Sequence, residues 1–256
     1  MNKANITENI NIYPGTNGQA VLFIHGFGGK PAMLGFLFKY LNRKGYTVYS
    51  PILLGHDNFE NLDKYRPEDW ITQAEGFFTE IKKKHEKVFL IGASFGGNIC
   101  INLAGKFAKE IKGVLLLETP IFFNFKIALI LKIFLPIFEF LNISRISKNR
   151  FVYRSRYAKD GHSVEFLPIK AVGEVYRFIK NEAKGHVAKV SAPIYIFQGE
   201  KSDLIRKKSA SFIFDNVKSM IKKVEFLPID NHDFDLFDEK DRIIMMEKMY
   251  DFMSKV

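Results

Sequence analysis

Short apolar runs alternate along the chain with longer segments in which apolar residues recur every three or four positions. The short runs have the length and composition of buried strands, and the longer segments are typical of helices with one apolar face. Because continuous apolar strands need cover on both faces, this alternation predicts an α/β fold with a mostly parallel sheet between two helical layers. The predicted strands are residues 19–24, 46–50, 88–91, 113–118, 193–199 and 222–227.

The alternation is interrupted once, between about residues 119 and 188. This stretch is apolar in its first part, basic in its second, and mostly helical in pattern. We therefore expect a core built from residues 1–118 and 189–256 and a small helical cap formed by residues 119–188. In folds of this kind an insertion at this place lies above the carboxyl ends of the strands, where the binding sites are found.

Composition agrees with one large domain. The 256 residues are 47% hydrophobic, which suffices for a full core and argues against extensive disorder. Cys100 is the single cysteine, so no intramolecular disulfide is possible, and its apolar neighbours predict a buried, inert thiol. Residues 1–8 carry no apolar signal segment, so we expect a cytoplasmic protein.

Charge is unevenly distributed. The formal net charge is +10, and residues 144–189 hold eleven Lys or Arg against four Asp or Glu. The chain has no zinc-finger spacing, RNA-binding signature or basic zipper, so we expect no nucleic-acid partner. Two interpretations of the basic cap stay open: a solvated face, or attraction to anionic lipid surfaces. Residues 121–141 are apolar, but Lys126 and Lys132 make a membrane-spanning helix improbable.

The third predicted strand ends in Gly-x-Ser-x-Gly at residues 92–96, and a helical pattern follows. This is the context of a nucleophile elbow, a sharp strand-to-helix turn that exposes the serine hydroxyl. We expect Gly92 and Gly96 to be required because a Cβ there would collide with a neighbouring element. Ser94 is therefore the candidate nucleophile, at a helix start that favours developing negative charge.

A serine nucleophile needs a base and an acid that orients the base. Of the six histidines, His232 follows the last predicted strand, at the sheet edge where Ser94 is also expected. Asp203 follows the preceding strand, which gives the chain order serine, acid, histidine expected for this architecture. Glu200 in the same loop and Glu118 at an earlier strand end are rival acids. Asp230, Asp233 and Asp235 are more consistent with capping the final helix.

The oxyanion hole requires two backbone N–H groups directed at one point. Phe95, directly after the serine, supplies one. Phe27 is the natural second, because Gly26 and Gly28 on either side let the backbone approach closely.

Several motifs together resemble those of α/β-hydrolases, in particular small bacterial carboxylesterases and monoacylglycerol lipases with a compact helical cap. The resemblance covers nearly the whole chain outside the predicted cap, and it implies a triad of Ser94, Asp203 and His232 with oxyanion amides from Phe27 and Phe95. In two places the chain departs from these relatives: Asn231 replaces a small residue, and Phe95 replaces leucine or methionine. The matching motifs are His-Gly-Phe-Gly-Gly at 25–29, Gly-His at 55–56, Pro-Glu-Asp-Trp at 67–70, Gly-Ala-Ser-Phe-Gly-Gly at 92–97, Gly-Glu-Lys-Ser-Asp at 199–203 and Asn-His at 231–232.

The resulting hypothesis is a serine hydrolase that cleaves short- to medium-chain acyl esters or monoacylglycerols through an acyl-enzyme, with no metal or organic cofactor. The apolar residues of the predicted cap, beyond those that pack its core, would line an acyl pocket. Thioesterase, peptidase and carbon–carbon hydrolase activities remain alternatives, as does a non-catalytic ligand-binding protein on the same scaffold. A dehalogenase is disfavoured because it would have an aspartate in place of Ser94.

Overall fold

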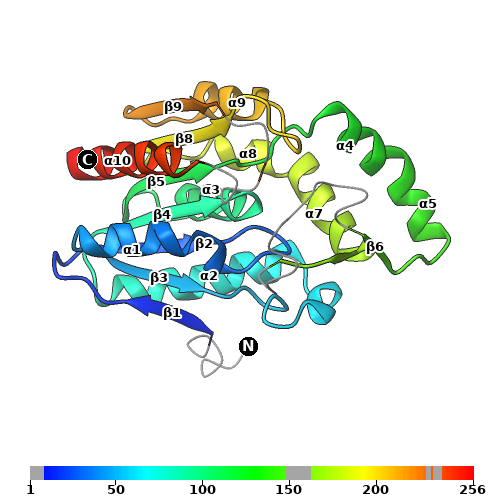
Figure 1. Cartoon of the computed structure of the whole chain (residues 1–256), viewed down its shortest axis with the longest axis horizontal. Coiled ribbons are helices and arrows are strands. Elements are labelled where there is room, and N and C mark those ends of the chain that lie inside the picture. The colour runs from blue at the N-terminus through cyan, green and yellow to red at the C-terminus, as the bar shows by residue number, and fades with distance from the viewer. Residues whose placement is uncertain (1–8, 148–162, 229–231, 233–237) are drawn as a thin grey trace.

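The computed structural model describes residues 9–147, 163–228, 232 and 238–256. Within these residues a seven-stranded sheet forms the centre of the molecule, in the order β1-β3-β2-β4-β5-β8-β9 (Figure 1). β1 pairs antiparallel with β3, and all other pairs in this sheet are parallel. The strands are β1 (Ile10–Tyr13), β2 (Ala20–Ile24), β3 (Thr47–Pro51), β4 (Val88–Ala93), β5 (Ile111–Leu117), β8 (Ile194–Gly199) and β9 (Lys222–Leu227).

All six strands predicted from the apolar runs are present, with ends shifted by at most two residues, and the predicted α/β class is confirmed. β1 was not predicted. It has only four residues, and its partly exposed side chains give no apolar run. Its place at the sheet edge, bound only to β3, explains why so weak a pattern can form a strand.

Helices cover both faces of the sheet (Figure 1). Side chains alternate along β2, so that Val21 and Phe23 pack in one apolar layer and Leu22 and Ile24 pack in the other. The first layer includes residues of α1 and α10, and the second includes residues of α2, α3 and α9. The helices of the two layers are α1 (Gly35–Arg43), α2 (Pro67–Lys82), α3 (Phe95–Lys106), α9 (Lys208–Asn216) and α10 (Glu239–Lys255), and short 3-10 turns η2 (Pro31–Leu34) and η3 (Phe59–Lys64) precede α1 and α2.

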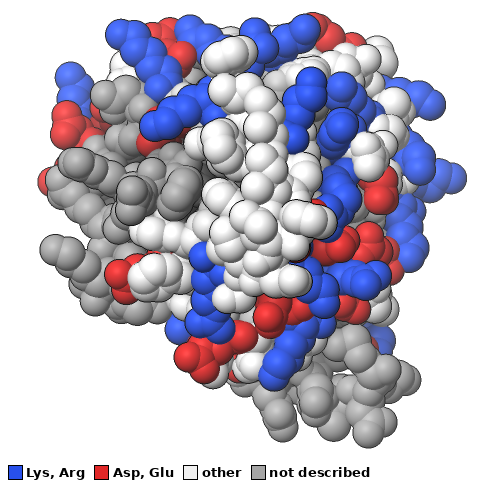
Figure 2. Space-filling view, turned by 90° about the vertical axis from the view of Figure 1, so that its right-hand side faces the viewer, with Lys and Arg blue, Asp and Glu red and all other residues white. Residues whose placement is uncertain are grey.

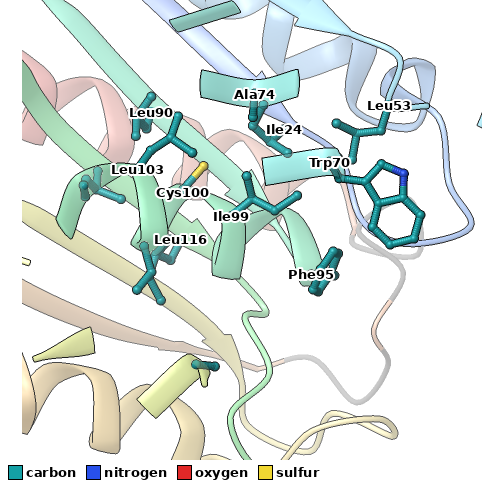
Figure 3. Packing of buried hydrophobic residues seen from close by; sticks show 14 of the residues in the cluster. Ile24, Leu53, Trp70, Ala74, Leu90, Phe95, Ile99, Cys100, Leu103 and Leu116 are labelled. Carbon is teal, nitrogen blue, oxygen red and sulfur yellow. The ribbon is translucent and has the colours of Figure 1, made fainter. Parts of the chain in front are cut away.

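α3 is the best-buried helix of the core. In the second layer Cys100 lies among Ile99, Leu103 and Leu116 (Figure 3). Its side chain is fully buried, as predicted, and burial raises the pKa of the thiol far above its ordinary value.

The chain between β5 and β8 is the predicted cap region. Its elements are α4 (Phe125–Leu129), the π-helical turn η4 (Ile130–Phe134), α5 (Leu135–Phe140), the antiparallel strands β6 (Arg145–Ser147) and β7 (Phe166–Pro168), α7 (Ile169–Asn181) and α8 (Ala183–Val187). The sequence pattern predicted a mostly helical region and did not indicate β6 and β7, which form a two-stranded sheet. The limits 119–188 stay a prediction, since residues 148–162 lie outside the described chain.

α4, η4 and α5 form one helical arm, residues 125–140, at the end of the molecule toward which the parallel strands point (Figure 1). Pro136 accounts for the π-helical turn, because it has no N–H to donate to the preceding turn and its ring needs space there. Arg177 of α7 holds α5 through an ion pair with Glu139 at 3.1 Å. Among the described residues, no helix combines the length and the apolarity that crossing a membrane requires.

Candidate active site

Ser94 forms the sharp turn between β4 and α3. Its backbone angles are φ 52° and ψ −125°, a conformation that residues with a side chain rarely adopt. A Cβ on Gly92 would lie 2.6 Å from the Cα of Gly97, and a Cβ on Gly96 would collide with the carbonyl oxygen of Ile24. The turn therefore has the close packing and the backbone strain that the motif predicted.

His232 brings its imidazole to Ser94. The imidazole Nε2 lies 2.8 Å from the Ser94 Oγ, within hydrogen-bond distance, although the two residues are 138 positions apart in the chain. His232 is 4% exposed, so the contact is almost closed to water. The nucleophile and the base predicted from the sequence thus lie at the separation that proton transfer requires.

Two carboxylates contact His232 at different atoms. The Glu118 Oε2 lies 3.1 Å from the imidazole Nδ1, and the Asp203 Oδ1 accepts the main-chain N–H of His232 at 3.0 Å. From the sequence, Asp203 was predicted as the acid that orients the imidazole, with Glu118 as an alternative. The structure brings both carboxylates to His232: Glu118 contacts the imidazole ring, and Asp203 contacts the main chain. The third candidate, Glu200, is half exposed and pairs with Lys207 at 3.4 Å.

Gln198 was missed at the sequence level. It lies in β8, is 1% exposed, and donates its side-chain N–H to the Glu118 Oε1 at 3.0 Å. A buried amide in an otherwise apolar strand needs a polar partner. Gln198 in the predicted strand was therefore the one feature of the sequence that could have indicated a buried polar group beside it.

The two amides predicted for the oxyanion hole belong to segments that border Ser94. Phe95 is the first residue of α3, so its N–H has no acceptor within the helix. Among the described hydrogen bonds none uses the N–H of Phe27, and a Cβ on the neighbouring Gly26 would lie 3.0 Å from the Cβ of Ser94. The assignment of these two amides as oxyanion donors remains a prediction.

His25 and His56 hold the loop that carries Phe27. The Nε2 of His25 accepts the N–H of Leu53 at 3.0 Å, and the Nε2 of His56 accepts the N–H of Gly28 at 3.1 Å. Burial lowers the pKa of His25 to about 4 and that of His56 well below its ordinary value, so both rings are neutral near pH 7. These histidines act as hydrogen-bond acceptors that support the loop.

The remaining histidines lie away from Ser94 or outside the described chain. His85 contacts the hydroxyl of Tyr49 at 2.9 Å, and His186 contacts the side chain of Asn102. His162 and the acids Asp230, Asp233 and Asp235 fall outside the described residues.

An apolar pocket opens beside Ser94. It reaches from the loop that carries Phe27 to the helices between β5 and β8, and among its described lining only Ser94 and Tyr176 have a polar side-chain atom. The other lining residues are Phe27, Phe95, Pro120, Phe123, Ile127, Leu131, Leu167, Val172, Val175, Ile179 and Leu204.

The parallel sheet, the serine elbow at the end of β4 and the histidine after the last strand define an α/β-hydrolase. Comparison with known sequences identifies a family within this class. The chain belongs to the serine aminopeptidase S33 family, whose sequence model matches residues 15–241.

Known relatives of similar length include esterases and lipases. A carboxylesterase of Bacillus subtilis (strain 168) is 23% identical over 240 residues, which is 93% of either chain. A thermostable monoacylglycerol lipase of Bacillus sp. (strain H-257) is 24% identical over 92% of this chain and 90% of the lipase.

Solved structures show the same fold. A structure from the work on LipS and LipT, two metagenome-derived lipolytic enzymes, superposes with a TM-score of 0.81 over 97% of this chain and 98% of that one, at 20% identity. A monoacylglycerol lipase of Paleococcus ferrophilus superposes with a TM-score of 0.73 over 96% of this chain and 98% of that one, at 18% identity.

Proposed function

We propose that the protein is a serine hydrolase that cleaves carboxylic esters with an apolar acyl group. The observation that carries the proposal is the 2.8 Å contact between the Ser94 hydroxyl and the His232 imidazole at the mouth of an apolar pocket. The esterase and monoacylglycerol lipase relatives support the same substrate class.

In the first half-reaction the His232 Nε2 takes the proton of Ser94, and the Oγ attacks the ester carbonyl carbon. The negative charge that forms on the carbonyl oxygen is stabilised by the amides of Phe27 and Phe95. His232 then gives the proton to the leaving alcohol as the ester bond breaks. Water repeats the same sequence on the acyl-enzyme, which releases the acid and restores Ser94. A carboxylate behind the imidazole, Asp203 or Glu118, stabilises its transient positive charge.

The pocket favours an ester over the peptide substrate in the family's name. An aminopeptidase has to hold the charged amino terminus of its substrate, which calls for a carboxylate in the pocket. Among the described lining residues there is none, and the side chains of Ile127, Leu131 and Val175 suit an acyl chain instead.

The helical arm, residues 125–140, is apolar on two faces. Ile127 and Leu131 of the arm line the pocket, together with Phe123 just before the arm, while Phe125 and Phe140 are more than 80% exposed. A surface helix ordinarily presents polar residues to water, so this outer face is suited to an apolar partner. Further exposed apolar residues of the arm and directly after it are Leu129, Ile133, Phe134, Ile137 and Leu141.

The charge around this face matches an anionic lipid surface. Figure 2 shows uncharged residues running down the middle of the face, with Lys and Arg gathered above them and on their right, interspersed with fewer Asp and Glu. A bilayer with anionic headgroups offers both an apolar interior and negative charge, and the chain carries a net charge of +10. The proposal therefore includes peripheral contact of the arm with anionic lipid, which would place the pocket near lipid-borne esters.

The catalytic proposal is tested with p-nitrophenyl esters of graded acyl length, aminoacyl p-nitroanilides and a fluorophosphonate that labels activated serines. We expect ester cleavage, one label on Ser94, and a loss of turnover on the order of a millionfold in Ser94→Ala. Activity of Ser94→Ala within tenfold of the wild type, or cleavage of the anilides alone, would reject it.

The lipid contact is tested by flotation with phosphatidylcholine vesicles that contain or lack phosphatidylglycerol. Binding should need the anionic lipid, weaken as salt increases, and fall at least tenfold in Phe125→Ser/Phe140→Ser. Met220→Ser is the matched control, because Met220 is 95% exposed but precedes β9, away from the arm. Binding that ignores salt and lipid charge, or an equal effect of the control, would contradict the contact.

A further inference from the structure

We infer that Glu118, rather than Asp203, orients the imidazole of His232 and stabilises its positive charge during the reaction. The inference rests on the proposed function of Ser94 and His232. It assigns the acid position to the end of β5, one strand from the nucleophile, although the sequence pattern favoured the loop after β8.

The hydrogen bonds fix the tautomer. Both oxygens of an ionised carboxylate only accept, so the contact between the Glu118 Oε2 and the His232 Nδ1 at 3.1 Å requires the proton on Nδ1. The lone pair is then on Nε2, which faces the Ser94 Oγ at 2.8 Å. This is the arrangement that a general base needs, and it follows from the contact of the ring with Glu118 alone.

The carboxylate of Glu118 is itself held in place. Its Oε1 accepts hydrogen bonds from the side chain of Gln198 and from the main-chain N–H of Gly199. The residue is 1% exposed, and an ion there needs such donors because water cannot reach it. When His232 takes the serine proton, the two opposite charges face one another with little solvent screening, where their attraction is strongest.

The backbone of Glu118 has an uncommon conformation. Its φ of 50° is in the left-handed region, which is unfavourable for a residue with a Cβ. Hydrogen bonds on both sides hold it there: the N–H of Glu118 donates to the Phe197 carbonyl at 2.9 Å, and the N–H of Ser94 donates to the Leu117 carbonyl at 2.7 Å. Strain of this kind persists where the site needs the resulting side-chain position.

Asp203 has a different task in this arrangement. Its Oδ1 accepts the main-chain N–H of His232 at 3.0 Å, and its own main-chain carbonyl accepts a hydrogen bond from the side chain of Asn124. Asp203 thus positions the backbone that carries the histidine and links it to the segment before α4. It acts on the placement of His232, whereas Glu118 acts on the tautomer and charge of the ring.

The test compares Glu118→Gln with Asp203→Asn, two changes that keep shape and remove charge. In Glu118→Gln we expect kcat to fall roughly 10³- to 10⁴-fold with KM within about threefold, as when a triad acid becomes an amide. The acidic limb of the pH dependence of kcat/KM should also move to lower pH, because the imidazolium loses its partner. Asp203→Asn should lose at least tenfold less kcat and leave the limb in place.

A larger kcat loss and limb shift in Asp203→Asn than in Glu118→Gln would overturn the inference. Near-ultraviolet circular dichroism from the buried Trp70 measures the folded fraction of each variant. Should Glu118→Gln not fold, ¹⁵N-histidine labelling decides the question in the wild type and Asp203→Asn: a downfield Nδ1 proton of His232 should persist in folded Asp203→Asn, and its loss there refutes the assignment. That spectrum needs no turnover, so a failure of the proposed ester hydrolysis is distinguishable from a failure of this inference.

Discussion

The buried His25 makes the stability of the protein sensitive to mild acid. The side chain is 2% exposed, and its pKa is lowered from 6.5 to about 4 mainly by burial, against a smaller raising effect of its hydrogen bond to the Gly26 carbonyl. In the unfolded chain His25 takes a proton near pH 6.5, whereas in the folded protein it does so only near pH 4. Unfolding therefore takes up a proton between these values, and the free energy of unfolding falls as the pH falls.

The magnitude follows from the two pKa values. A shift from 6.5 to about 4 corresponds to about 3 kcal/mol in full. Lowering the pH from 7 to 5 removes about 2 kcal/mol of this, since the histidine is mostly protonated in the unfolded state at pH 5 and mostly neutral in the folded state. For a chain of this length the loss lowers the melting temperature by roughly 4–8 °C. His56, whose pKa is also lowered by burial, adds in the same direction.

The assay is urea unfolding at pH 7 and pH 5, followed by circular dichroism, for the wild type and His25→Gln. The Oε1 of glutamine can accept the N–H of Leu53 that the His25 Nε2 accepts at 3.0 Å, so the variant removes the titrating group with little change in bonding. We expect the difference in unfolding free energy between the two pH values to be about 2 kcal/mol smaller in the variant. An equal pH dependence in both proteins would refute the reasoning, whatever the variant's stability at pH 7.

Three further predictions concern the packing around the site. Gly96→Ala should abolish fluorophosphonate labelling and lower the melting temperature, because its Cβ would meet the Ile24 carbonyl; normal labelling would contradict the predicted collision. Trp70→Phe removes the 2.8 Å bond to the Leu54 carbonyl and indole volume, so urea unfolding should show a loss of about 1–3 kcal/mol, and no measurable loss would count against it. Cys100 should react with a thiol reagent only at the rate of unfolding, and fast labelling of native protein would show that it is accessible.

Most of the sheet could be predicted because β2, β3, β4, β5 and β8 are buried along nearly their whole length. Such strands read as largely apolar runs, and each predicted strand is present. The pattern failed where burial is partial. β1 lies at the edge of the sheet, with two exposed side chains between two half-buried ones, and β6 and β7 have three residues each, too short for a period to be seen.

Part of the candidate site could be predicted because the functional residues of this fold lie at or after the ends of strands. Ser94 is fixed by its local motif, and His232 by its place after the last strand. The choice between Glu118 and Asp203 was not accessible, because it depends on the direction of side chains from two neighbouring strands and on the path of the loop that carries His232. The motif at residues 199–203 favoured Asp203, but a motif gives the position of a carboxylate along the chain and not the atom that it contacts.

The strand order explains why two carboxylates meet one histidine. Ser94 follows β4 and His232 follows β9, and β5 and β8 lie between these strands. Neighbouring strands are about 4.8 Å apart, so three spacings separate the strand ends by roughly 14 Å. His232 therefore lies far from the end of β9 and contacts residues that follow the other strands. Its main-chain N–H meets Asp203, which follows β8, and its ring meets Glu118 at the end of β5 and Ser94 at the end of β4. The order of the sheet thus favours a division of labour, with Asp203 on the main chain and Glu118 on the imidazole.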